Sequence, residues 1–436
     1  MRSTTYQCLG PLTVRAWKDS ADDNLRAGPM PAIAGRARKR LKPLTWEVVD
    51  PSRADDSLGQ RIPPLGQWQQ TIVRLVTLWS PFACYQAVLG AWPHGPAGIV
   101  VWFALLWTLF LTCHLIANGR WWIWLTVSLF PPLGFAVVPA VLLAAAFVIG
   151  GAAGINTSLL AIGALVSTGR QTGINVRLPT RRVPSAMNGS NGVTTGTRPI
   201  RIMSWNTQYW HQGGDPDEFY SYLRSWDADI YLLQEYIYHV GNWRYRLLDD
   251  DERLFAAFSD YQIAISDQLV TISRLPIAGT PVSLAPHVLR VDVQTARNGP
   301  VLSTYNVHVP VQFAPLSPLH REFYQVMRQR AASRNLHYHC LARDLAANTH
   351  PALVAGDFNA SPAVGDLQRL AEVATDAIRA SRSLNPVSWD ARRRARALWR
   401  LDWVFVAGRV TVHQYEFRSP DGRSDHRVQW LLVTVD

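Results

Sequence analysis

The sequence predicts an N-terminal region of membrane-spanning helices followed by an α/β sandwich. From Leu75 to Gly169 the chain contains no Asp, Glu or Lys, and Arg120 is its only formal charge. From Ile200 onward, short apolar strands alternate with helices, which is typical of a sandwich and not of a helical bundle. Several of these strands end in a polar side chain, where a sheet presents side chains at its rim. We therefore expect the apolar tract to lie in lipid and the C-terminal α/β region to lie in water.

The apolar tract is long enough for three or four spans, because about 20 apolar residues cross the hydrocarbon core of a bilayer. It divides into Thr71–Gly90, Ala97–Ala117 and a block from Trp121 to about Ser167, which prolines interrupt. The block holds either one span with an interfacial lead or a tight pair. The tract begins too late for a cleaved secretory signal. We therefore expect residues 67–168 to be a retained transmembrane anchor.

Polar segments flank the anchor. Residues 1–66 form a basic tail that we expect to be poorly ordered, with one short helix at most, and residues 169–199 have the composition of a flexible linker. The net charge of +11 is concentrated in Arg36–Lys42, Arg170–Arg201 and Arg392–Arg400. Without interleaved aromatic residues, such runs favour juxtamembrane or solvated faces over a nucleic-acid surface. The four cysteines show no metal or disulfide spacing.

The placement of the C-terminal domain depends on the number of spans. Arg120 and the basic tail mark their loops as cytoplasmic by the positive-inside rule. Three spans then place the domain outside the cytoplasm, although the arginines of the linker favour the opposite side. The expectation is a multi-pass cell-membrane protein with an extracytoplasmic domain at residues 200–436.

Two helices and eight strands are predicted in the C-terminal domain. Asp215-Pro216 is a helix start that leads into Phe219–Trp226, and a second, long helix covers Glu322–Ala347. Apolar runs of strand length cover the following residues: Ile200–Trp205, Ile230–Gln234, Val270–Ser273, Val288–Val293, Val301–Val307, Ala352–Ala355, Trp403–Val406 and Val428–Val433.

Six short motifs place polar residues at the ends of these strands. Taken singly, each has an ordinary structural explanation: Asn206 as a turn former, Glu235 as an exposed carboxylate, Asp402 as a structural one. Their joint occurrence in one order is not explained in this way. The motifs are Ser204-Trp-Asn206, Leu233-Gln-Glu235, Asn306-Val-His308, Gly356-Asp-Phe-Asn359, Leu401-Asp-Trp403 and Ser424-Asp-His426.

With these motifs, residues Arg198–Asp436 resemble the endonuclease/exonuclease/phosphatase superfamily, including its multi-span membrane-anchored members. The resemblance also covers Thr271-Ile-Ser-Arg-Leu-Pro-Ile277, where Arg274 is read mainly as structural and alternatively as a phosphate contact. It implies the DNase I-like fold, a four-layer arrangement in which two packed sheets are flanked by helices. It also implies hydrolysis of phosphate esters with Mg²⁺, for which Mn²⁺ is a possible substitute.

The resemblance assigns Glu235, Asn206 and Asp425 to the metal. Glu235 is a hard oxygen ligand suited to Mg²⁺, which needs only one or two carboxylates and keeps several waters. Asn206 and Asp425 would complete the metal environment directly or through water.

Five further residues are expected to carry the chemistry. Asp357 would orient and deprotonate the attacking water, and Asn359 would donate to a phosphoryl oxygen. Asp402 and His426 form an expected carboxylate–imidazole pair that presents a cationic ring to the phosphate. His308 would donate to the phosphate or assist the leaving group.

Three functions remain open from sequence. The leading one is a membrane-anchored Mg²⁺-dependent phosphoesterase that acts on a lipid-linked or envelope-associated substrate. The alternative is a membrane-tethered nuclease for DNA or RNA, supported only by the arginines at 392–400. His308 argues against an abasic-site repair enzyme. A catalytically silent binding module is disfavoured because all the expected carboxylates and histidines are present. The oligomeric state is not specified.

Overall fold

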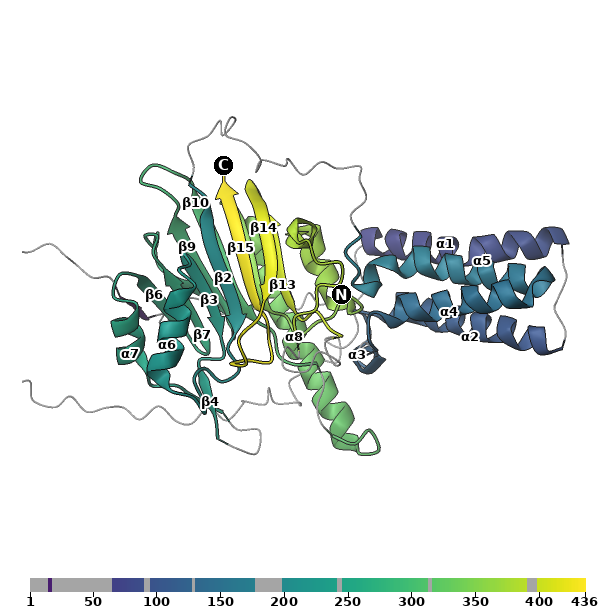
Figure 1. The fold of residues 1–436 in the computed structure, drawn as a ribbon, viewed down its shortest axis with the longest axis horizontal. Helices are drawn as coiled ribbons and strands as arrows, with labels where there is room; N and C mark the ends of the chain where they lie inside the picture. The colour runs from purple at the N-terminus through teal and green to yellow at the C-terminus, as the bar shows by residue number, and fades with distance from the viewer. Residues whose placement is uncertain are drawn as a thin grey trace, which may run out of the picture.

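The computed structural model describes residues 15–17, 65–89, 95–127, 130–176, 198–240, 245–312, 316–389 and 398–436. These residues form a helical bundle and a C-terminal α/β domain, which lie end to end (Figure 1). The remaining residues, among them most of the predicted tail and residues 177–197 of the predicted linker, lie outside this description.

The bundle contains four long helices that run alternately away from and toward the C-terminal domain (Figure 1). They are α1 (Leu65–Leu89), α2 (Pro96–Ala117), α4 (Gly134–Ile149) and α5 (Gly151–Thr168), with the short α3 (Trp124–Val127) between α2 and α4. The third apolar block therefore forms a tight helix pair, turned at Gly150 and Gly151, whose φ angles are 58° and 54°. Among the described helices, α2 and the segment Gly151–Thr172 have the length and composition to cross a membrane.

The bundle is joined to the C-terminal domain by direct contacts. The Asn118 amide nitrogen donates to the Ala363 carbonyl at 2.5 Å, and its oxygen accepts from Gly365 N at 2.9 Å. A Cβ on Gly119 would lie 2.8 Å from the Gly365 backbone, so this approach requires glycine. The buried Asn175 donates to three carbonyls of residues 378–383, at 3.1–3.2 Å. The described start of the predicted linker, residues 169–176, is thus packed and is not a free tether.

The C-terminal domain contains two main β-sheets. The first has the order β1 (Arg15–Trp17), β6 (Gln262–Ser266), β7 (Leu269–Ser273), β3 (Ile230–Gln234), β2 (Ile200–Asn206), β15 (Val428–Val435), β14 (Val410–Arg418). The second has the order β12 (Thr375–Asp376), β13 (Asp402–Ala407), β11 (Ala352–Asp357), β10 (Val301–His308), β9 (Val288–Gln294), β8 (Val282–Ala285). A separate hairpin pairs β4 (Ile237–His239) with β5 (Tyr245–Leu247).

All eight predicted strands are present, and the long helix is α8 (Arg321–Ala347). The prediction for the tail was incomplete, because β1 pairs antiparallel with β6 at the edge of the first sheet. A three-residue segment is too short to show a strand pattern in the sequence. It forms a strand because the edge of the sheet supplies its hydrogen-bond partners.

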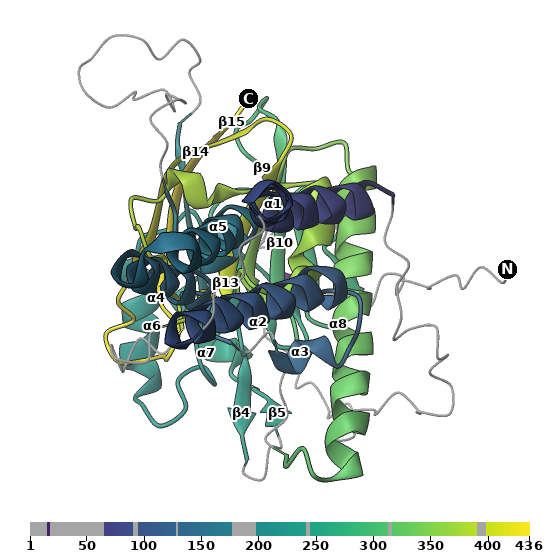
Figure 2. The ribbon, with the colours of Figure 1, turned by 90° about the vertical axis from the view of Figure 1, so that its right-hand side faces the viewer.

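The domain has the predicted four layers. Helices α6 (Pro216–Ser225) and α7 (Asp251–Ala257) cover the outer face of the first sheet, where Trp205 and Tyr231 belong to the buried cluster. The two sheets share a core that contains Ile202, Leu353 and Leu431. Helix α8 and the 3-10 helix η3 (Gly365–Glu372) cover the second sheet. Viewed along the bundle, α8 runs beside α3 and the C-terminal end of α2 (Figure 2).

Candidate active site

The strand register brings the six motifs to one edge of the sandwich. Strands β2 and β3 are parallel and end side by side, at Asn206 and Gln234, just before Glu235. In the second sheet His308 is paired with Asp357, and Asp357 with Asp402. Residues that lie far apart in the chain therefore meet because their strands end, or begin, at the same edge. All eight predicted site residues lie at this edge.

Glycine is required where β10 and β11 approach each other. Gly356 has a φ of 147°, and a Cβ at this position would lie 1.9 Å from the Val307 carbonyl oxygen. No other residue fits this approach without moving the strand. Gly356 therefore sets the position of Asp357, the residue that follows it.

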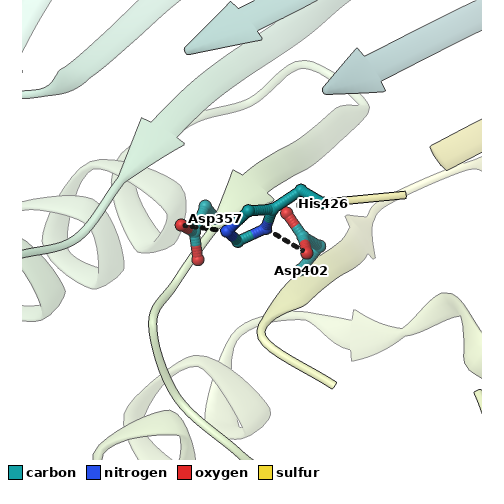
Figure 3. A group of neighbouring side chains, drawn as sticks. All are labelled: Asp357, Asp402 and His426. Atoms are coloured by element: carbon teal, nitrogen blue, oxygen red, sulfur yellow. Dashed lines mark hydrogen bonds and ion pairs between the residues drawn. The ribbon is translucent and has the colours of Figure 1, made fainter. Parts of the chain in front are cut away.

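Asp402, His426 and Asp357 form a buried line of alternating charge (Figure 3). His426 Nδ1 lies 2.9 Å from Asp402 Oδ2, and His426 Nε2 lies 3.7 Å from Asp357 Oδ2. Burial alone would lower the pKa of His426, but the Asp402 and Asp357 carboxylates outweigh it and raise that pKa well above its ordinary value. The ring is therefore a cation that points toward Asp357.

Asn206 connects the two carboxylates on the other side of the site. Its amide nitrogen donates to Glu235 Oε1 at 3.2 Å and to Asp357 Oδ2 at 3.0 Å. Glu235 Oε2 accepts from the Tyr209 backbone N–H at 3.0 Å. Gln208, Tyr209 and Trp210 all have positive φ, between 54° and 68°, which is uncommon for residues other than glycine. This turn directs an N–H group at the Glu235 carboxylate.

Asn359 faces Asp357. Its backbone N–H donates to Asp357 Oδ1 at 2.8 Å, and its side-chain amide donates to Asp357 Oδ2 at 3.1 Å and to the Val309 carbonyl at 2.9 Å. The side chain was expected to donate to a phosphoryl oxygen. Both of its amide hydrogens are instead used within the protein, so in this arrangement Asn359 orients the Asp357 carboxylate.

His308 and Asp425 complete the group. His308 Nε2 lies 3.7 Å from Asp357 Oδ2 and 3.9 Å from Glu235 Oε1. Burial, with the neighbouring histidines, lowers the pKa of His308 well below its ordinary value, so the ring is neutral. Asp425 lies at the rim, where Oδ1 is 4.0 Å from His426 Nε2 and Oδ2 accepts from Trp389 Nε1 at 3.2 Å.

The site concentrates carboxylates that have no arginine or lysine partner among the residues that the structure describes. Burial raises the pKa of Asp357 to about 7, although His426 opposes this shift. Burial also raises the pKa of Glu235. A buried negative charge is costly unless a cation or hydrogen bonds compensate it. The hard oxygen donors of Glu235, Asp357 and Asp425 therefore fit a divalent metal ion.

A second arrangement of metal ligands is less suitable. Ligand atoms of Asp357, Asp402 and His426 lie within 4.8 Å of one another. His426 Nδ1 is, however, already hydrogen-bonded to Asp402, and the ring is cationic. A metal ligand must be neutral or anionic, so the Glu235 side of Asp357 is the better location.

Several supporting residues were not predicted. Tyr209 and Trp389 hold Glu235 and Asp425, and the Ser388 hydroxyl accepts from the backbone N–H groups of Leu401 and Asp402 at 2.9 and 3.0 Å. They act from irregular segments without periodicity, so no local pattern marks them.

Arg274 lies away from the site. It binds Asp227 at 2.6 Å and Asp229 at 3.3 Å, at the opposite ends of the strands. The structural interpretation of this arginine therefore holds over the phosphate contact.

Comparison with known proteins identifies the family. Residues 203–426, just over half of the chain, match the model of the Endonuclease/Exonuclease/phosphatase family. No curated protein matches the chain in sequence. Similar solved structures include an endonuclease/exonuclease/phosphatase from Beutenbergia cavernae, with 16% identity, coverage of 55% of this chain and 72% of that chain, and a TM-score of 0.42.

Two other similar structures come from eukaryotes. The human nocturnin catalytic domain has 17% identity, coverage of 55% and 95%, and a TM-score of 0.39. An AP endonuclease from Leishmania major has 14% identity, coverage of 55% and 89%, and a TM-score of 0.40. The family match over residues 203–426 shows that this chain belongs to the endonuclease/exonuclease/phosphatase family and is a hydrolase that acts on phosphoesters.

Proposed function

We propose that the protein is a membrane-anchored, Mg²⁺-dependent phosphoesterase that acts on a lipid-linked or otherwise membrane-associated phosphate ester. The observation that carries this proposal is the convergence of eight polar residues on one sheet edge, in a domain docked directly onto an apolar helical bundle. The family generally depends on a divalent metal; Mg²⁺ is our assignment, because the donors are oxygen atoms.

The chemistry follows from the charges at the site. A bound metal ion would neutralise phosphoryl oxygens and stabilise the leaving oxygen. Glu235 would hold it, with Asp425 at the rim and Asn206 orienting both Glu235 and Asp357. Asp357 would take a proton from the attacking water, since a pKa near 7 suits a general base at neutral pH.

The two histidines would act on the phosphate in different ways. The His426 cation, held by Asp402, would stabilise negative charge that develops on the phosphoryl group. His308 is neutral and would donate one hydrogen bond to the phosphate or the leaving oxygen.

The surface of the bundle supports a membrane anchor. Large apolar side chains project outward from all four helices, among them Val76 (58% exposed), Phe103 (64%), Val141 (62%) and Val166 (67%). Polar contacts lie inside, such as the 2.6 Å hydrogen bond from Gln86 to the buried Asn156. Exposed apolar side chains on all four helices support the proposal that lipid, and not water, surrounds the bundle.

The four-helix arrangement bears on the orientation. The expected extracytoplasmic placement depended on three spans, whereas with four helices the chain enters the bundle at α1 and leaves it at α5 on the side of the C-terminal domain (Figure 1). Arg120 donates to Thr71 near the start of α1, and Arg74 and Arg170 line one cavity between α1 and the segment after α5. The connector between α1 and α2, residues 90–95, includes no Lys or Arg. By the positive-inside rule, we propose that the tail and the catalytic domain are both cytoplasmic.

One observation favours the opposite side. Cys340 is disulfide-bonded, and disulfides persist mainly in oxidising compartments. The charge distribution outweighs this single bond, because it combines three arginines, Arg74, Arg120 and Arg170, with a connector at 90–95 that contains no Lys or Arg. Labelling of introduced cysteines in intact cells tests this assignment: a cysteine at exposed Arg297 should be protected, and one at residue 94 accessible. The reverse pattern would place the domain outside.

The start of α8 suggests how a lipid substrate reaches the site. The segment that leaves the site after His308 leads to this end of α8, where Leu319 is 92% exposed and Tyr324 41% exposed. The Tyr324 ring lies 6.4 Å from Trp122, next to the bundle. Apolar and aromatic side chains beside the domain end of the bundle suit a membrane interface. A lipid phosphate would then meet the site without leaving the bilayer.

The test is phosphate release from phosphorylated lipids by the full-length protein in vesicles. We expect turnover that disappears with EDTA and returns with Mg²⁺ or Mn²⁺, and no turnover by Asp357→Asn. Activity that persists after chelation would contradict the mechanism. Cleavage of plasmid DNA or RNA, steeply dependent on salt, without any lipid activity would favour the nuclease alternative.

The nuclease alternative loses part of its basis. Of the arginines at 392–400, Arg400 is buried, binds Asp376 at 2.7 Å and lies over Trp403, so it is structural. The others, at 392–394 and 396, lie outside the described residues.

A further inference from the structure

A cavity separate from the candidate active site lies at the end of the bundle nearest the catalytic domain. It has a volume of about 600 Å³ and is formed between the first turns of α1 and the end of α5 with the residues that follow. Arg74, Arg170 and Gln171 line it, together with Val73 and Val166. None of its lining residues comes from the catalytic site, so its ligand need not be the substrate.

The two arginines in this cavity have no counter-ion in the part of the chain that the structure describes. Neither Arg74 nor Arg170 forms an ion pair or a side-chain hydrogen bond within the described parts of the chain, and no acidic residue lines the cavity. Arg120, at the same end of the bundle, differs because it donates to the Leu115 and Ile116 carbonyls and to Thr71. Two unpaired cations facing one cavity are the arrangement that an anionic group stabilises.

Gln171 is a second, independent sign of a ligand. Its side chain is 6% exposed and lines the cavity, yet its amide oxygen has no hydrogen-bond partner among the described residues. A buried unpaired amide costs free energy, and most such groups in native proteins have a partner. A headgroup that carries hydroxyls beside its phosphate would bind both the amide and the arginines.

The edge of the cavity is apolar. Val73 is 64% exposed and Val166 67% exposed, and both continue the outer surface of the bundle toward its far end. We propose that this cavity binds the phosphate headgroup of an anionic, hydroxyl-bearing phospholipid, with the acyl chains along Val73 and Val166. Basic pockets between membrane helices are suited to such headgroups. The inference rests on the proposed membrane anchor.

The experiment uses the full-length protein in nanodiscs of phosphatidylcholine containing a minor fraction of phosphatidylglycerol. Lipids retained after delipidation are counted by native mass spectrometry. We expect phosphatidylglycerol to be enriched on the order of tenfold, since each arginine near the headgroup contributes to its binding. The double variant Arg74→Gln/Arg170→Gln should lose this enrichment.

The matched control is Arg297→Gln/Arg409→Gln, which removes two exposed charges from the catalytic domain and should keep the enrichment. Equal retention of both lipids, or enrichment unchanged in the pocket variant, would overturn the proposal while leaving the anchor intact. Displacement of phosphatidylglycerol by millimolar inorganic phosphate would assign the cavity to a soluble anion instead. Failure to enter nanodiscs of either composition would contradict the anchor itself, and the pocket proposal with it.

Discussion

The two ends of strands β2 and β3 carry charged clusters of opposite design. At one end, Asp227 and Asp229 are bound by Arg201 and Arg274, with distances from 2.5 to 3.3 Å. These bonds, from Arg274 and then Arg201, lower the pKa of the exposed Asp227 to about 2. At the other end, Glu235 and Asp357 meet without an arginine from the described segments, and burial raises the pKa of both.

This difference separates structure from function. Ion pairs near the surface tie β2, β3 and β7 together and leave nothing for a ligand to neutralise. Uncompensated buried carboxylates destabilise the empty site and persist where a cation and a substrate supply the missing charge. Identical residue types therefore have different roles, and their partners decide which.

The largest effect is expected from Asp357→Asn. The amide keeps the size of the carboxylate but cannot accept the proton of the attacking water, so kcat should fall about 1,000-fold. Phosphate release under saturating metal measures this. The thermal midpoint should stay the same or rise, because a buried negative charge is removed. A variant that keeps the full rate would show that another group is the base.

A smaller loss is expected from Glu235→Gln, which removes the negative charge from the proposed metal ligand. The metal concentration that supports half-maximal activity should rise on the order of 100-fold. Calorimetric titration of the EDTA-treated protein with Mn²⁺ and Mg²⁺ measures the change directly. Identical titrations of variant and parent would contradict the assignment, and the absence of binding in both would favour the silent-module hypothesis.

The two ends should also respond to pH with opposite signs. Asp357 has its folded-state pKa raised from 3.8 to about 7, so the folded protein holds a proton that the unfolded chain releases. The contribution of Asp357 to the free energy of unfolding is complete below pH 3.8 and is lost as the pH rises to 7. Asp227, with a folded-state pKa of about 2, contributes above pH 3.8 and is lost as the pH falls toward 2.

Thermal unfolding of the EDTA-treated protein in detergent measures this behaviour. The midpoint should fall between pH 5 and pH 7, and Mg²⁺ should restore it above pH 7. Asp357→Asn should flatten this fall, while Asp227→Asn should leave it unchanged. A midpoint that rises with pH in the absence of metal would contradict the raised pKa of Asp357.

The smallest effect is expected at the paired end. Arg274→Gln breaks the bonds to Asp227 and Asp229 and should lower the free energy of unfolding by about 0.5–1 kcal/mol, since these pairs are partly exposed. Its kcat should stay within about twofold of the parent, because Arg274 lies at the opposite ends of the strands from the site. Chemical denaturation and the phosphate-release assay test both values. A large loss of activity would return Arg274 to the site.

The sequence by itself determined the strands and named the eight candidate site residues. Apolar runs such as Ile230–Gln234 and Val301–His308 are local patterns, because the length and composition of a buried strand belong to the segment itself. The eight polar residues could be named because their motifs, in this order, resemble those of the endonuclease/exonuclease/phosphatase superfamily.

Only the tertiary structure decided which groups face each other. The number of bundle helices depended on the turn at Gly150. The bundle docks on the C-terminal domain because Asn118 reaches Gly365. The orientation of the Asn359 side chain is set by its bonds to Asp357 and Val309. Strand β1 likewise depends on β6 as its partner. These features rest on contacts between segments that are mostly distant in the chain, whose free energy no local pattern encodes.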